Sequence, residues 1–258
     1  MKPMPLSRER VALLFASLLL VSAVADARPW NCKPGSFGTG PGKLVVEDRT
    51  PAAAFSAVDV ANGACVEIVQ GDKFNVRVEG EADTLRELDI IVENGALKIR
   101  DTKQSGFKKF FSRDNNRILR VIVTAPQYKA LAVHGSGDVI ADTLKAAALK
   151  LSVAGSGDIR VNNLDAQSLT SSISGSGDIQ TSGKVDSVTA NISGSGDVDH
   201  SGLVADTVTV AIAGSGAAKV WANRALSVSI AGSGDVVYKG SPTIKKSVAG
   251  SGSVKPMS

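Results

Sequence analysis

Aliphatic and small polar residues alternate through much of the second half of the chain. Leu149, Leu151 and Val153 are separated by Lys and Ser, and residues 208–212 repeat the arrangement with Val and Ile at the apolar positions. A period of two is typical of a β-strand with one buried face. The residues between the apolar positions are mostly small, which indicates a flat exposed face. The pattern therefore predicts strands, with aliphatic side chains forming the core.

The alternation is interrupted by the triplet Gly-Ser-Gly, which occurs seven times at intervals of 18 to 20 residues. The triplets begin at residues 135, 155, 175, 194, 214, 232 and 250. This repeat is too short for two helices and their turns, but it accommodates three short strands and three corners, which make one rung of a β-solenoid. Such rungs stack ~4.8 Å apart. We therefore predict an all-β fold, a single-stranded parallel β-helix with regular rungs over residues 125–254.

An aspartate follows the triplet in five of the seven copies, and Ala217 and Ser253 replace it in the others. The five are Asp138, Asp158, Asp178, Asp197 and Asp235. An Asp beside a turn commonly accepts hydrogen bonds from backbone N–H groups. The competing interpretation is a row of Ca²⁺ ligands, because this cation prefers oxygen donors. One carboxylate per rung and the interruption at Ala217 favour the turn cap. We expect no cofactor other than this alternative calcium.

Residues 44–124 lack the triplet but also contain strand-like segments. Asn94 and Gly95 lie between two alternating runs, which is a strong signal for a hairpin. Residues 81–88 are the one stretch that could form a short helical turn. We interpret residues 44–124 as the irregular first rungs of the same solenoid, so that residues 44–254 form one β-helix domain.

The first 27 residues have the composition of a secretory signal peptide. Basic residues precede an apolar run over residues 11–25, and Ala25-Asp26-Ala27 provides a cleavage site. The run is shorter than the ~20 residues that span a bilayer. Residues 28–43 would form an N-terminal extension of the mature chain, for which we expect no transmembrane segment. The mature protein is therefore predicted in the periplasm, at the cell surface or outside the cell.

Charge and cysteine content narrow the choice of partners. The net charge of the whole chain is +4, which is too weak to indicate a nucleic acid, and export argues further against one. Cys32 and Cys65 are the only cysteines. Two cysteines in an exported chain more often pair than stay free, so we predict a disulfide between them. Lipid attachment at Cys32 is the alternative, but small apolar residues do not precede it.

Two parts of the chain together resemble the bacterial family described as putative auto-transporter adhesin head GIN domains. One is the stretch from Phe55 to Ile99, with its QGD and VEG turns and its final NGALKI, and the other is the series of Gly-Ser-Gly-Asp rungs. The resemblance covers roughly residues 44–254. It implies an exported, right-handed parallel β-helix, and the adhesin role is implied by the family name alone. The family offers no agreed catalytic positions to carry over.

A carbohydrate-active enzyme is the rival class, because some parallel β-helices are polysaccharide lyases and hydrolases. Glycoside hydrolysis requires a pair of carboxylates at a defined separation, whereas the repeated Asp residues occupy equivalent corners. Sugar clefts also favour aromatic platforms, and the rungs offer only Trp221 and Tyr238. His134 and His200 fit no metal-ligand spacing and are interpreted as surface or packing residues. We therefore predict that the protein is not an enzyme.

Residues 98–120 contain eight basic and two acidic residues, with phenylalanines between them. The residues of this segment that we predict to contact an anionic surface are Lys103, Phe107, Lys108, Lys109, Phe110, Phe111 and Arg113. Such a segment could contact an acidic envelope component, or it could be a loop whose rings cover an open end of the solenoid. The sequence thus predicts an exported, non-enzymatic module that binds an anionic envelope component or a surface glycan. A calcium-binding solenoid and a carbohydrate-active enzyme remain alternatives, and the oligomeric state stays open.

Overall fold

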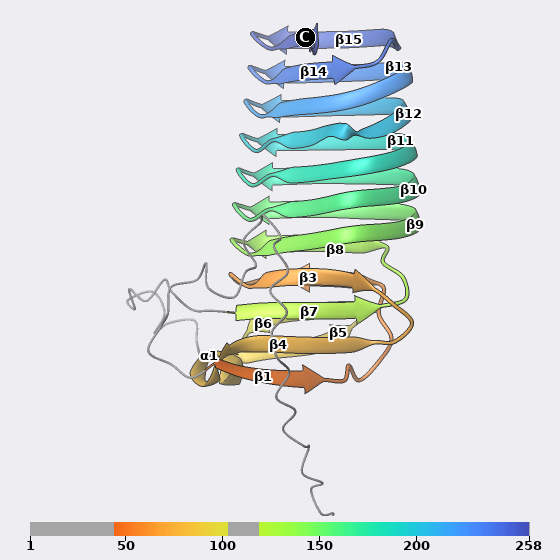
Figure 1. Cartoon of the computed structure of the whole chain (residues 1–258). Helices are drawn as coiled ribbons and strands as arrows, with labels where there is room; N and C mark the ends of the chain where they lie inside the picture. Colours follow the sequence, from red (N-terminus) through yellow and green to blue (C-terminus); the bar gives the residue numbers. More distant parts are fainter. Residues whose placement is uncertain (1–43, 103–118, 258) are drawn as a thin grey trace, which may run out of the picture. The chain divides into compact units, whose positions relative to one another are not determined.

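The computed structural model of the chain describes residues 44–102 and 119–257. The predicted signal peptide, the extension to residue 43 and residues 103–118 of the basic segment lie outside the described residues. The described residues form a stack of parallel β-rungs that continues from a more irregular N-terminal part (Figure 1). The prediction of a β-solenoid is confirmed.

The regular part of the stack consists of long parallel strands in register. It comprises β8 (Ala130–Gly135), β9 (Asp138–Gly155), β10 (Ile159–Gly175), β11 (Ile179–Gly194), β12 (Val198–Gly214), β13 (Ala217–Gly232), β14 (Asp235–Lys239), β15 (Thr243–Gly250) and β16 (Ser253–Pro256). The first Gly of each triplet pairs with its equivalent in the next rung. Each complete rung is one strand that curves around the core and is interrupted only at the triplet. The predicted three separate strands per rung are therefore wrong in detail, because the chain bends within one strand, with only local shifts of register in the ladder.

The triplet glycines are required by the close stacking of the corners. Gly175 has a φ of 137°, and a Cβ built on it would lie 2.3 Å from the carbonyl oxygen of Gly155. A Cβ on Gly177 would lie 2.0 Å from the oxygen of Gly157. Both distances are impossible for a real side chain, so these contacts exclude every residue except Gly.

The core consists of aliphatic side chains that repeat at equivalent positions in successive rungs. The inward residues before the triplets are buried from β8 to β13, and those after them are buried as far as β14. Three polar side chains, those of Ser171, Thr181 and His200, are buried inside the regular rungs. The last rung differs: β15 is exposed along its length, and Lys246 takes the place of the inward Val228 below it. An inward charge on an edge strand discourages pairing with another chain.

The N-terminal part is built from short strands in both directions. It comprises β1 (Leu44–Arg49), β2 (Ala57–Val60), β3 (Cys65–Gln70), β4 (Asn75–Glu81), α1 (Ala82–Arg86), β5 (Leu88–Glu93), β6 (Ala96–Asp101) and β7 (Leu119–Ala125). The predicted helical turn is α1, and the predicted hairpin joins β5 and β6. Asn94 and Gly95 of that hairpin both have positive φ.

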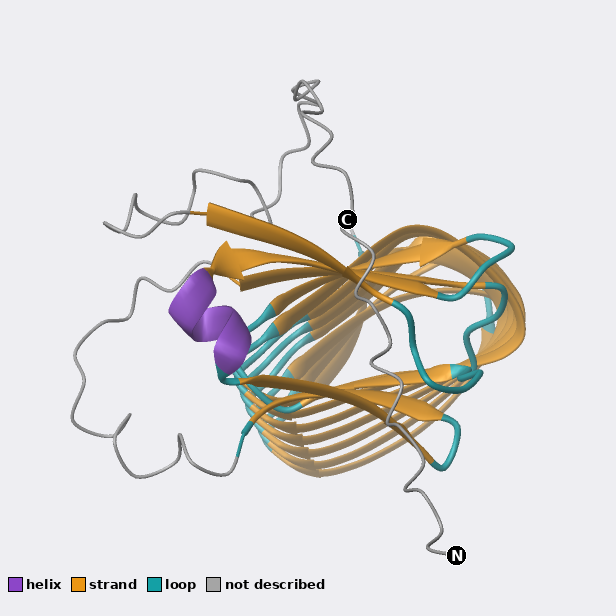
Figure 2. Ribbon diagram, turned by 90° about the horizontal axis from the view of Figure 1, so that it is seen from below, coloured by secondary structure: helices purple, strands orange, loops and turns teal. Residues whose placement is uncertain are grey.

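The stacking order of these strands does not follow the sequence. One face runs β1-β4-β7-β3-β9 and the other runs β5-β6-β2-β8-β9. The rung of β2 and β3 therefore lies directly beside β8 and β9, while the later β6 and β7 lie beyond it. Strands β1, β4 and β5 add antiparallel pairs. Figure 2 shows α1, which joins β4 to β5, on the side where the corners of the regular rungs lie. The irregular first rungs thus include an antiparallel end that the pattern did not indicate.

Candidate functional site

The corner aspartates form a row in which each carboxylate serves the next rung. Oδ1 of Asp158 accepts a hydrogen bond from the backbone N–H of Asp178 at 2.9 Å, and Oδ1 of Asp178 accepts one from Asp197 at 2.9 Å. The same contact joins Asp138 to Asp158, Asp197 to Ala217, and Asp235 to Ser253. These carboxylates therefore tie neighbouring rungs together, whereas a turn cap would bind within its own corner.

The row shows no further sign of a metal centre. Within residues 44–102 and 119–257, no three His, Cys, Asp or Glu side chains are grouped so that they could hold a metal ion. Burial raises the pKa of Asp138, while hydrogen bonds from Ser253 lower the pKa of Asp235. Calcium at these corners stays a prediction.

The flanks of the basic segment are engaged in ion pairs. The contact residues proposed above, from Lys103 to Arg113, lie outside the described residues. Among their described neighbours, Lys98 contacts Glu93 at 2.7 Å and Arg100 contacts Asp89 at 3.0 Å. Arg120 bridges two glutamates of neighbouring strands. These three cations are neutralised locally, so anion binding by the segment would depend on residues 103–118.

Cys65 begins β3 and is buried. No cysteine in the described part of the chain is a free thiol. Cys32 lies outside that part, so the pairing of Cys32 with Cys65 stays a prediction.

The aromatic and histidine side chains considered above as candidate site residues make structural contacts. The ammonium group of Lys239 lies 5.6 Å from the centre of the Trp221 ring, a cation–π contact along the rod wall. His134 is exposed, with Nε2 3.5 Å from a carboxylate oxygen of Asp59. Tyr238 is half-buried and packs against the core. None of these side chains forms a platform in a cleft.

His200 lies fully inside the rod, where it links two hydroxyl groups. Its Nε2 is 2.9 Å from Oγ of Ser171 across the core, and its Nδ1 is 2.7 Å from Oγ1 of Thr181 in the rung below. Burial lowers the pKa of His200 to about 4, so the ring is neutral at neutral pH. A substrate cannot reach this group, because Ser171 and His200 are 0% and 1% exposed. The arrangement holds the core together and is not a catalytic site.

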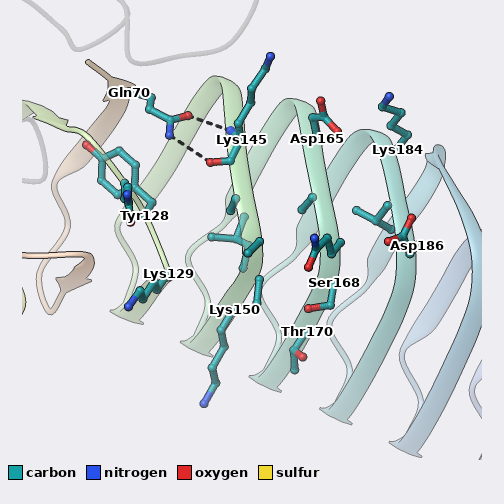
Figure 3. Close-up of a pocket in the computed structure, with 18 of the residues that line it drawn as sticks. Gln70, Tyr128, Lys129, Lys145, Lys150, Asp165, Ser168, Thr170, Lys184 and Asp186 are labelled. Atoms are coloured by element: carbon teal, nitrogen blue, oxygen red, sulfur yellow. Dashed lines mark hydrogen bonds between the residues drawn. The ribbon is translucent and has the colours of Figure 1, made fainter. Parts of the chain in front are cut away.

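A depression in the described structure lies on the side where the rungs bend, opposite the corners. It is an open groove of about 1050 Å³ that extends from β3 and the segment before β8 across β9, β10 and β11 (Figure 3). Its lining residues are Gln70, Pro126–Lys129, Lys145–Lys150, Asp165–Ser168, Thr170 and Lys184–Asp186. We call this surface the side groove. Its floor consists mainly of Ala, Ser and Thr.

Two residues fix the end of the side groove where the regular rungs begin. The Gln70 side chain donates to the carbonyl oxygens of Pro126 and Lys145 and accepts from the N–H of Lys145 at 2.8 Å. It thereby replaces the missing strand pairing at the end of β3. The hydroxyl of Tyr128 donates to Val69 and Val123 carbonyls, and burial raises the pKa of this phenol. Neither group is available to a ligand.

The charged side chains of the side groove are the ones left for binding. Four lysines and two aspartates line it: Lys129, Lys145, Lys150, Lys184, Asp165 and Asp186. All six are exposed, and none forms an ion pair with another described residue within 4.0 Å. Sequence reasoning missed this site, because charges 15 to 20 residues apart resemble an ordinary solvated face. Alignment of the repeats would have placed Lys145, Asp165 and Lys184 in one row.

No helix among the described residues is long and apolar enough to cross a bilayer.

Known proteins provide close structural relatives. A putative adhesin from Bacteroides fragilis is 22% identical with a TM-score of 0.76, over 83% of this chain and 97% of that chain. A putative lipid binding protein from Parabacteroides distasonis is 26% identical with a TM-score of 0.67, over 85% and 98%. A putative adhesin from Parabacteroides merdae is 20% identical with a TM-score of 0.65, over 85% and 98%.

No curated protein matches the chain. Residues 54–242, however, match the family described as "Putative auto-transporter adhesin, head GIN domain". This match covers the N-terminal strands and nearly all the Gly-Ser-Gly rungs, the two parts on which the resemblance rested. The chain therefore belongs to the putative auto-transporter adhesin, head GIN domain family.

Proposed function

We propose that the protein is an exported, non-enzymatic module that binds a component of the cell envelope or surface through the side groove. The observation that carries this proposal is the set of six exposed charges in one groove, none of which is neutralised by a described neighbour. Elsewhere on the regular rod, Asp199 pairs with Lys219 and Asp206 pairs with Arg224. The rigid in-register ladder would hold these charges at fixed separations.

The chemistry of the described residues supports binding and not catalysis. His200 is sealed in the core and cannot assist the aspartates of the groove. The corner carboxylates repeat one contact along the rod. The names of the relatives agree with a binding role, since two are putative adhesins and one is a putative lipid binding protein.

The test is binding of the purified mature chain, predicted to begin after residue 27, to isolated envelope fragments from the producing bacterium. Saturable binding without release of sugar fragments is the expected result. Fractionation of cells that express the full-length chain would locate it in the periplasm or at the surface. A cytoplasmic location, or enzymatic breakdown of the fragments, would contradict the proposal.

The lipid-binding name of one relative suggests a second test with the same protein. Vesicles of anionic phospholipid should compete weakly with envelope fragments if the ligand is a polymer. Strong competition would instead favour a membrane surface as the partner.

A further inference from the structure

The lysines of the side groove lie along its two edges. Lys145 of β9 and Lys184 of β11 are on one edge, with Asp165 of β10 between them in register. Lys129 and Lys150 point toward the other edge (Figure 3). These two residues belong to adjacent rungs, because the N–H of Lys150 donates to the carbonyl oxygen of Lys129 at 2.9 Å. A ligand in the groove would therefore meet positive charge from both sides.

We infer that the side groove binds a linear acidic polysaccharide that lies along the stacking direction and carries a carboxylate on every second sugar. This inference rests on the proposed function and names its ligand class. The groove crosses successive rungs, so a polysaccharide laid along it passes the equivalent position of each rung in turn. A planar bilayer would contact the groove edges and leave the floor empty.

The charge pattern selects the spacing of the acidic groups. Lys145 and Lys184 are two rungs apart, which corresponds to ~9.6 Å at the ordinary strand spacing. Asp165 lies between them and repels any negative group at the intermediate position. A like charge at one position is an effective way to reject the wrong ligand. Densely charged polymers, such as a highly sulfated glycan or a nucleic acid, would place a negative group against Asp165.

The floor of the groove suits a sugar chain held by charge and hydrogen bonds. Ala146, Ala148 and Ala166 keep it shallow, while Ser168 and Thr170 offer hydroxyl groups. The aromatic side chain at the groove, Tyr128, is 2% exposed and cannot stack on a sugar ring. Neutral glycans would therefore gain little here. The lysines need not leave an ion pair to bind, in contrast to the cations of β6 and β7.

The probe for the test is hyaluronan, a linear polymer with a carboxylate on every second sugar, and the protein is the mature chain. We expect saturable binding by calorimetry or fluorescence anisotropy that weakens as salt is raised. The double variant Lys145→Glu/Lys184→Glu should lose at least about tenfold in affinity. The matched control Lys245→Glu/Lys255→Glu changes the net charge equally at exposed positions of the last rung. It should change the affinity by less than about twofold.

A third variant tests the role of Asp165 directly. Asp165→Asn should strengthen binding of heparin, a densely sulfated polymer, by at least about threefold and change hyaluronan binding less. Circular dichroism and the melting midpoint should be unchanged in all variants, because the substituted side chains are exposed.

Several outcomes would overturn the inference. Equal losses in the groove and control variants would show non-specific attraction. Equal binding of neutral dextran would remove the role of charge. Binding of phosphatidylglycerol vesicles that depends on Lys145 and Lys184, without hyaluronan binding, would identify a membrane ligand. Envelope binding that is lost in Lys145→Glu/Lys184→Glu, without any hyaluronan binding by the natural chain, would keep the proposed function and reject this ligand class. Envelope binding that survives the double variant would reject the groove as the binding surface and with it the proposed function.

Discussion

The N-terminal part of the β-domain, from β1 to β7, and the regular part, from β8 onward, are stabilised by different kinds of contact. From β8 onward, each rung repeats the same backbone, and neighbouring corners stack glycine on glycine. From β1 to β7, strands of both directions are joined by a hairpin and a short helix, and charged side chains pair across them. The regular part tolerates almost no change at its corner glycines, because every rung restricts the next. The N-terminal part is specified by particular contacts, each of which affects only its neighbours.

The two parts also differ in whether their charged side chains are available for binding. In the N-terminal part most charged side chains form ion pairs, within one element or between strands. In the side groove, which begins where the two parts meet, the outward charges are exposed and unpaired among the described residues. The outward charges of the groove are therefore free for binding.

The largest expected effect is the replacement of a corner glycine. Gly177→Ala should destabilise the fold by more than about 4 kcal/mol or prevent folding, because its Cβ would lie 2.0 Å from a stacked carbonyl oxygen. The matched change Gly95→Ala, in the β5–β6 hairpin, should cost only about 1 kcal/mol. Gly95 has a φ of 75° but open space around its Cβ position. Chemical denaturation of both variants measures the contrast, and equal losses would refute the account of the corners.

The next effect is acid sensitivity arising from the buried His200. Its pKa is about 4 in the folded protein against 6.5 for the free side chain, so the unfolded chain binds the proton more tightly. Stability contributed by the neutral ring is complete above pH 6.5 and is lost as the pH falls toward 4. The loss over this window should be roughly 3 kcal/mol. Urea titrations at several pH values measure it.

A matched variant isolates this histidine. Ser171→Ala/Thr181→Val/His200→Val would make the interior apolar, as at the equivalent Val161 and Val220. Between pH 6.5 and 4, the free energy of unfolding of this variant should depend less steeply on pH. The difference should correspond to about one proton fewer taken up on unfolding than in the natural chain. An unchanged slope would assign the acid sensitivity to other groups.

A smaller effect is expected from the ion pairs of the N-terminal part. Arg120→Met should cost about 1–2 kcal/mol, because Arg120 bridges Glu67 and Glu79 while only 21% exposed. Arg86→Met removes the exposed pair of Arg86 and Asp83 and should change stability by less than about 0.5 kcal/mol. Added salt should reduce the cost of the first change. If both variants lose the same free energy of unfolding, burial does not determine how much these ion pairs contribute to stability.

The smallest effect belongs to a corner aspartate. Asp178→Ala removes one hydrogen bond to the N–H of Asp197 and should cost about 1 kcal/mol. Asp178→Asn keeps an oxygen acceptor and should cost less, since the row of like charges is also relieved. A melting midpoint that rises with Ca²⁺ in the natural chain, but not in Asp178→Ala, would instead support calcium at the corners.

The sequence by itself determined the rungs. Alternation defined which residues face inward, and the spacing of the triplets defined the corners, since both properties are local and repeat in a linear pattern. The hairpin at Asn94-Gly95 and the short helix near residue 82 were predicted for the same reason. The corner aspartates were correctly linked to backbone N–H groups, although the partner in the next rung could not be inferred from a single repeat.

Only the tertiary structure decided which distant residues meet. The placement of β2 and β3 against β8 and β9, ahead of β6 and β7, depends on pairing between segments that alternation cannot distinguish. The contact of His200 with Ser171 crosses the core between residues 29 positions apart. The side groove likewise combines Gln70, Lys129 and Lys184, which line one surface because the stacking of rungs brings distant segments side by side. Local periodicity specifies the rung, whereas stacking creates the binding surface.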